Sequence, residues 1–167
     1  RAGAEILDVN VGLPDINETE MMHDAIIALQ SITNAPLQID STNVEVLKKA
    51  LRVYNGKPIV NSVNGEEASL ANILPLVKKY GTAVVGLTLD EKGIPAKAEE
   101  RFAIAERIVN KATAIGIPKE DIIIDCLTLT ASAEQKGVVE TLKAIEMVKS
   151  RLGVKTVLGV SNISFGL

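Results

Sequence analysis

Short apolar runs rich in valine and isoleucine recur along the chain, and each ends in polar residues. With their endings, the six runs cover residues 6–10, 37–43, 59–64, 84–88, 122–125 and 157–162. Such runs are typical of parallel strands that are buried on both faces. Asp and Asn at the end of a buried strand are costly unless they bind something. Because ligands bind at the carboxyl ends of parallel strands, the pattern predicts one polar mouth, formed by these six endings.

Between the runs, apolar residues recur every three or four positions, which is the spacing of amphipathic helices. These stripes comprise Met22, Ile26 and Leu29; Val44, Leu47, Leu51 and Tyr54; Leu70, Ile73, Leu74 and Val77; Phe102, Ala105, Ile108, Val109 and Ala112; and Leu142, Ile145, Val148 and Leu152. Strands and helices therefore alternate without a hairpin signal or a linker. We interpret residues 1–167 as a single domain.

The alternation predicts an α/β fold with six parallel strands, which is most of a (β/α)8 barrel lacking its first and last strands. The sequence opens on Arg1 without an initiator Met and closes on Leu167, directly after a predicted strand. Both ends therefore look cut, and we expect a fragment of a longer chain. A complete open sheet of flavodoxin type is the alternative.

Composition narrows the function classes. The chain is 47 % hydrophobic and 23 % charged, as in ordinary soluble domains, and its net charge is −3. Without a basic cluster, we expect no nucleic-acid partner. No run approaches the roughly 20 apolar residues of a membrane span, so we expect no membrane association. The single Cys fits a reducing, cytoplasmic setting, and one His with one Cys predicts no zinc site.

Some polar endings have a structural explanation. Thr42, Asn64 and Asn17 each precede a predicted helix with a Glu three residues later, so we expect them to act mainly as helix caps. Capping does not explain Asp40, Asn61 and Asp125. These residues come too early in the sequence to cap the helices that follow them.

The early polar residues Asp40, Asn61 and Asp125 suit a flat, uncharged heterocycle rich in N–H groups. A carboxylate accepts two parallel N–H bonds, and a carboxamide reads a mixed donor and acceptor edge. A closed network of Asp–Asn pairs is the alternative. We expect His23 to lie on a helix surface, and Cys126 to be an inert thiol facing the helices, because side chains alternate along a strand.

The strand endings resemble those of the pterin-binding barrel family, which includes dihydropteroate synthases and methyltetrahydrofolate methyltransferases. The motifs are LDVNVG at 7–12, IDSTN at 39–43, VNSVNG at 60–65, ID at 124–125 and GVSNIS at 159–164. They follow the family's order over essentially the whole chain. The segments 86–91 and 161–166 look most like the folate-binding domain of cobalamin-dependent methionine synthases. Cys126 departs from the Pro or small residue that is usual there.

The resemblance implies roles for particular residues. Asp40, Asn61 and Asp125 would hold the pterin ring. Asn162 would also bind the pterin near N5, which carries the methyl group, and would be catalytic together with Asp125. Asp8 and Asn10 match a further motif of the mouth and are implied as supporting pterin-binding residues.

The implied activity is transfer of the N5 methyl group of 5-methyltetrahydrofolate to Co(I) of a corrinoid, as in methionine synthesis from homocysteine. The Asp-x-His-x-x-Gly cobalamin motif is missing, since His23 is the only histidine. The corrinoid would therefore be carried by a separate domain or protein. Three alternatives stay open: methyl transfer to a corrinoid iron–sulfur protein, a non-catalytic pterin- or nucleobase-binding module, and a structural half-barrel without ligand. A homodimer also stays open.

Overall fold

The computed structural model describes residues 3–128 and 135–160. Its strands are β1 (Leu7–Val9), β2 (Leu37–Asp40), β3 (Ile59–Asn64), β4 (Ala83–Leu87), β5 (Ile122–Asp125) and β6 (Lys155–Val157). Its α-helices are α1 (Glu18–Ile32), α2 (Val44–Val53), α3 (Glu67–Tyr80), α4 (Ala98–Ala114) and α5 (Gln135–Met147). A 3-10 turn (Lys119–Asp121) precedes β5, and a π-helical turn (Val148–Leu152) extends α5. Within these ranges, no helix combines the length and the apolar character that crossing a bilayer requires.

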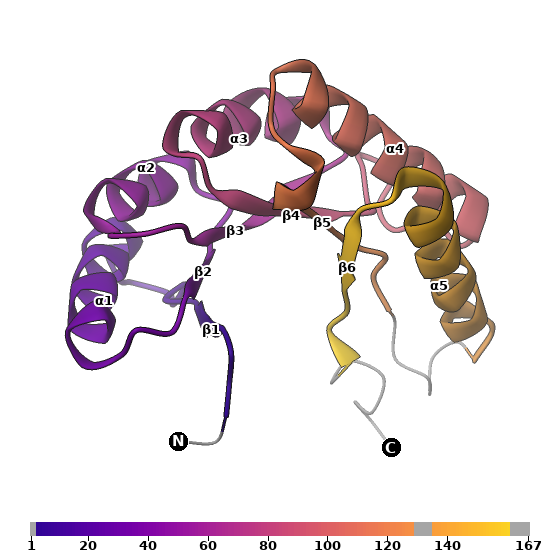
Figure 1. Cartoon of the computed structure of the whole chain (residues 1–167). Helices are drawn as coiled ribbons and strands as arrows, with labels where there is room; N and C mark the ends of the chain where they lie inside the picture. Colours follow the sequence, from indigo (N-terminus) through magenta and orange to yellow (C-terminus); the bar gives the residue numbers. More distant parts are fainter. Residues whose placement is uncertain (1–2, 129–134, 161–167) are drawn as a thin grey trace.

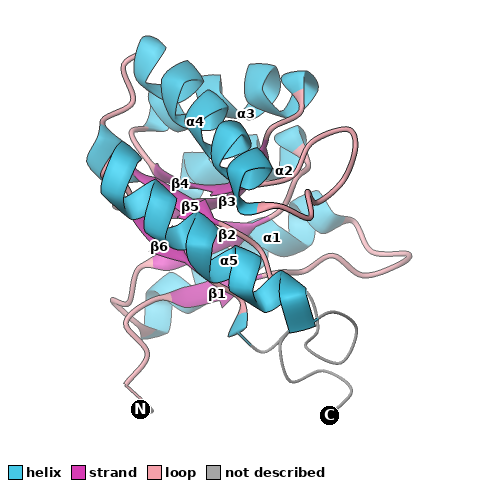
Figure 2. Ribbon diagram, turned by 90° about the vertical axis from the view of Figure 1, so that its right-hand side faces the viewer, coloured by secondary structure: helices cyan, strands magenta, loops and turns pink. Residues whose placement is uncertain are grey.

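The six strands form one parallel sheet, and their order in the sheet is their order in the chain. The sheet curls into an arc with the helices along its outer side (Figures 1 and 2). A flavodoxin-type sheet would break the sequential order and carry helices on both faces. The structure therefore confirms the prediction of most of a barrel and rules out the open-sheet alternative.

Burial alternates along the strands, as the two faces of the sheet require. In β2, Leu37 and Ile39 are buried toward the helices, whereas Gln38 and Asp40 are only partly buried. In β5, the buried residue Ile124 is followed by the partly exposed Asp125. The core therefore lies between the sheet and the helices. The opposite face, here called the inner face, carries the polar side chains.

The predicted details of the last strand and of two helix caps are wrong. The last strand covers Lys155–Val157 and does not continue through Leu158 and Val160, because the chain turns directly afterwards and Val160 N donates to Leu158 O at 3.0 Å. The cap of α2 is Asn43 and not Thr42. Because the helix starts at Val44, the Asn43 side chain is the one placed to accept from Glu45 N, at 3.0 Å.

Of the other two predicted caps, the one at Asn17 is present, whereas the one at Asn64 is wrong because the N-cap of α3 is Glu66, which makes no side-chain cap bond. The Asn17 side chain caps α1 by accepting from Glu20 N at 3.3 Å. The Asn64 side chain accepts from Glu66 N at 2.9 Å and so stabilises the turn that leads into α3. These bonds satisfy backbone donors that would otherwise have no partner at a helix start.

Candidate functional site

Predicted site residues from β1 and β2 are linked by hydrogen bonds across the inner face. Asn10 Nδ2 donates to Asp40 Oδ2 at 2.9 Å, and Gln38 Nε2 donates to Asp8 Oδ1 at 2.6 Å. The strand register explains both contacts, because Asp8 pairs with Gln38 and the following positions continue in step. Both bonds are exposed to solvent, so the groups remain available to a ligand.

Asn61 continues this polar row on β3. It is the register partner of Asp40, and its backbone carbonyl accepts from Ser41 N at 2.9 Å. The register between β3 and β4 shifts between Asn61 and Val63. Such irregularities re-aim side chains and are common beside functional sites. Asn10, Asp40 and Asn61 thus form a continuous row of amide and carboxylate groups across three strands.

Asp125 occupies the same face on β5, slightly nearer the mouth. The register runs from Asp40 through Asn61 and Val85 to Ile123, so Asp125 lies two residues farther along its strand. Asp125 is therefore not level with Asp40 and Asn61, although it lies on the same face toward the carboxyl ends of the strands.

The backbone and side chain of Asp125 are both held in place. Its carbonyl accepts from Thr88 N at 3.0 Å, and its carboxylate accepts from Leu127 N at 2.7 Å. Burial raises the pKa of Asp125, while the bond from Leu127 acts in the opposite direction. A partly desolvated carboxylate gains from a ligand that supplies N–H donors.

Cys126 and His23 lie where the sequence predicts. Cys126 is fully buried among the apolar residues of the core. Burial, reinforced by the charge of Asp125 and opposed by that of Arg101, raises the pKa of the Cys126 thiol to about 12. The thiol is therefore protonated at neutral pH and a poor nucleophile. His23 lies on α1 and contacts the Asp24 carboxylate at 2.9 Å, away from the strand ends.

Asn162, the residue expected near N5, lies outside the described residues. The described part of the site therefore consists of Asp8, Asn10, Asp40, Asn61 and Asp125. It contains no group of three or more His, Cys, Asp or Glu side chains that could hold a metal ion, and neither do the other described residues.

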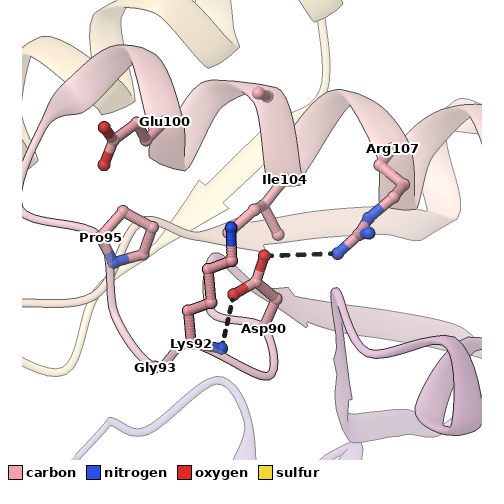
Figure 3. A pocket seen from close by; sticks show the side chains of 8 residues that line it. Asp90, Lys92, Gly93, Pro95, Glu100, Ile104 and Arg107 are labelled. Carbon is pink, nitrogen blue, oxygen red and sulfur yellow. Dashed lines mark hydrogen bonds and ion pairs between the residues drawn. The ribbon is translucent and has the colours of Figure 1, made fainter.

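A hollow of about 610 Å³ lies elsewhere, between α4 and the loop that follows β4 (Figure 3). Asp90 is one of the residues that line this hollow. The Asp90 carboxylate accepts from Lys92 N at 3.0 Å and lies 3.7 Å from the guanidinium of Arg107. These contacts hold the loop against α4. A smaller hollow of about 250 Å³ is lined in part by Thr42, Ser62 and, from α3, Ile73.

Sequence reasoning missed two residues that shape the site. Gln38 binds Asp8, and strand alternation could have found it, because it lies two residues before Asp40. Arg101 is buried in α4 and bonds to the backbone after β5. Helical spacing could have indicated Arg101, because it lies on the same buried face of α4 as Ala105 and Ile108.

The chain is similar to several characterised proteins. It is 38 % identical over 178 residues to methionine synthase of Mycobacterium leprae, covering 100 % of this chain and 15 % of that protein. It is 30 % identical over 169 residues to the methylcorrinoid:tetrahydrofolate methyltransferase of Eubacterium limosum, covering 99 % of this chain and 62 % of that protein. The chain thus spans less than two thirds of the length of either relative.

The fold matches solved structures of dihydropteroate synthases. The enzyme of Xanthomonas albilineans in complex with 7,8-dihydropteroate superposes with a TM-score of 0.68 at 20 % sequence identity, covering 95 % of this chain and 59 % of that one. This likeness concerns the barrel architecture. Residues 1–167, the whole chain, match the family described as pterin binding enzyme. On this match, the chain belongs to the family of pterin-binding enzymes.

Proposed function

We propose that this chain binds 5-methyltetrahydrofolate on its inner face and supports transfer of the N5 methyl group to Co(I) of a corrinoid. The observation that carries the proposal is the row of Asn10, Asp40 and Asn61 across three strand ends. The names of two relatives, a methionine synthase and a methylcorrinoid:tetrahydrofolate methyltransferase, support methyl transfer involving a folate and a corrinoid.

The polar row suits the amino-pyrimidine edge of a pterin. The Asp40 carboxylate can accept parallel N–H bonds, and the Asn61 carboxamide beside it offers both a donor and an acceptor. Asn10 already donates to Asp40 and so fixes the direction of that carboxylate. Asp125 would take further N–H groups of the ring, and Asp8 would act as a support through Gln38.

Methyl transfer requires the N5–methyl bond to break while N5 keeps the bonding electron pair. A tertiary amine leaves poorly unless it is protonated or accepts a strong hydrogen bond, and such help is typically worth about 10²–10⁴ in rate. We assign this role to Asn162, whose amide can donate or accept at N5 as its protonation changes. A water in contact with Asp125 would deliver the proton.

The methyl acceptor would reach the site from outside the chain. An approaching corrinoid domain or protein would reach the site at the carboxyl ends of the strands, where Asp40 and Asp125 end β2 and β5. The resemblance to methionine synthases favours homocysteine as the final methyl acceptor. A corrinoid iron–sulfur protein is the second candidate acceptor. The name of the relative from Eubacterium limosum supports only that a methyl group is exchanged between a corrinoid and a tetrahydrofolate.

A single-turnover experiment tests the proposal. The intact protein with bound 5-methyltetrahydrofolate is mixed with cob(I)alamin, and methyl transfer is followed by absorbance. Asn162→Ala should slow transfer by about two to three powers of ten while folate affinity changes by less than about threefold. Transfer at the unaltered rate in this variant would remove Asn162 from the reaction. A protein that binds the folate but never transfers its methyl group would be a binding module.

A further inference from the structure

One arginine is buried on the helix side of the sheet, close to Asp125. Arg101 lies in the first turn of α4 and is 1 % exposed. A buried guanidinium is costly unless its donors are bonded. Its Nε donates to Pro95 O at 2.7 Å, and its Nη1 donates to Cys126 O at 3.1 Å and Leu127 O at 2.9 Å. Arg101 therefore ties the segment before α4 to the turn after β5.

A third element joins the same cluster. The Thr141 hydroxyl of α5 accepts from Arg101 Nη1 at 2.7 Å. The same hydroxyl lies 2.8 Å from Leu127 O, to which it can donate. Thr141 is itself 1 % exposed, so these bonds form away from water. Bonds of this kind, to a charged donor in a buried setting, are among the stronger ones in proteins.

The turn that Arg101 binds has an unusual backbone. Leu127 has a φ of 55°, in the left-handed region that is unfavourable for a residue with a branched side chain. A helical conformation of either hand aligns successive carbonyls, which in a strand point in opposite directions. This explains how Cys126 O and Leu127 O both reach one nitrogen of Arg101. The N–H of Leu127 meanwhile donates to the carboxylate of Asp125 at 2.7 Å.

We propose that Arg101 is a positioning residue for the pterin site, acting through the Leu127 turn on Asp125. It lies on the helix side of the sheet and bonds to the backbone that follows Asp125. By holding two successive carbonyls it keeps Leu127 in the conformation whose N–H aims the Asp125 carboxylate toward the inner face. This inference rests on the proposed function, because Asp125 matters to binding only where a pterin lies on that face.

A double-mutant cycle on folate affinity tests the proposal. 5-Methyltetrahydrofolate is titrated into the intact protein as wild type, Arg101→Lys, Asp125→Ala and the double variant. Lysine keeps the charge but cannot reproduce the guanidinium fork. We expect Arg101→Lys to weaken binding about five- to tenfold in the wild type, and less than about twofold once Asp125 is absent. Arg52→Lys, at an exposed arginine in the last turn of α2, is the matched control and should leave affinity unchanged.

The outcomes separate the two claims. If Arg101→Lys weakens binding equally in both backgrounds, or in neither, Arg101 does not act through Asp125 and the positioning role is overturned. If Asp125→Ala binds the folate like the wild type, the proposed function itself fails at this residue.

A milder variant covers the case in which Arg101→Lys does not fold, as judged by circular dichroism. Thr141→Val keeps the side-chain shape but removes the hydroxyl that supports Arg101 and Leu127. It should weaken binding about two- to threefold in the wild type and have no effect beside Asp125→Ala. Unchanged affinity in Thr141→Val would then overturn the positioning role.

Discussion

Asp40 and Asn61 are register partners on neighbouring parallel strands, and Asp40 also accepts a hydrogen bond from Asn10 at 2.9 Å. Three groups of complementary hydrogen-bonding character are thereby placed side by side before any ligand arrives. Preorganisation of this kind reduces the ordering cost of binding.

Asp40→Asn should weaken binding of 5-methyltetrahydrofolate about tenfold. The amide offers one acceptor oxygen and places an N–H₂ group where the pterin presents its own donors. Isothermal titration of the intact protein measures the change. Asp24→Asn, an exposed carboxylate on α1 that contacts His23, is the matched control and should bind like the wild type. Equal affinities for Asp40→Asn and the control would contradict the role of Asp40.

Asn10→Ala should have a smaller effect, weakening folate binding about threefold. The variant leaves the Asp40 carboxylate in place but removes the exposed bond that orients it. The same titration measures this change. A loss larger than that of Asp40→Asn would mean that Asn10 binds the ligand directly, and that its contact with Asp40 is secondary.

Folate affinity should fall in acid at a pH above the ordinary Asp pKa of 3.8, because burial raises the pKa of Asp125. The ionised carboxylate accepts the ring N–H groups, so its contribution is complete above the raised pKa and is lost as the pH falls through it. Folate titrations of Asp125→Asn across the same pH range should not show this loss of affinity. A wild-type and a variant profile of the same shape would contradict the assignment.

Ionisation of the Asp125 carboxyl, which favours folate binding, lowers the stability of the unliganded protein. Its folded pKa lies above the unfolded value, so the folded state binds the proton more tightly. Its contribution to the free energy of unfolding therefore declines as the pH rises from 3.8 through the raised pKa, and is constant above it.

Cys126 should resist alkylation in the folded protein. Its thiol is fully buried and has a pKa of about 12, so almost no thiolate exists at neutral pH. Mass spectrometry of the peptide that contains Cys126, after iodoacetamide treatment with and without denaturant, measures this. Rapid modification of the native protein would show that β5 is not covered by the helices as described.

Asn43→Ala should lower the free energy of unfolding by about 1 kcal/mol, because it removes the cap of α2. Thr42→Ala, the neighbouring control, should change stability by less than half of that. Denaturant unfolding of both variants measures the difference. A larger loss for Thr42→Ala would restore the cap that the sequence pattern predicted.

The barrel could be predicted from the sequence because its two periodicities are clear. Valine and isoleucine runs mark the strands, and the stripe through Leu70 and Val77 marks a helix that the structure contains. The end of β6 could not be predicted, because Leu158 and Val160 are apolar and continue the pattern. Strand length there depends on pairing, and β5 pairs only with Lys155, Thr156 and Val157.

The site was predictable at the level of strand position. Their positions at strand ends predicted that Asp40 and Asp125 face one mouth, and the structure places both on the partly exposed inner face. The hydrogen bond between Asn10 and Asp40 was not predictable, because it depends on the register between two strands. Arg101 was missed because arginine is normally exposed, so its place on the buried stripe of α4 carried little weight.

The most direct test is a crystal structure of the intact protein with 5-methyltetrahydrofolate bound. We expect the pterin ring on the inner face, with its N–H groups within hydrogen-bonding distance of Asp40 and Asp125 and its mixed edge against Asn61. A folate bound in the hollow between α4 and the loop after β4, or anywhere that leaves these three side chains without contact to the ring, would contradict the account.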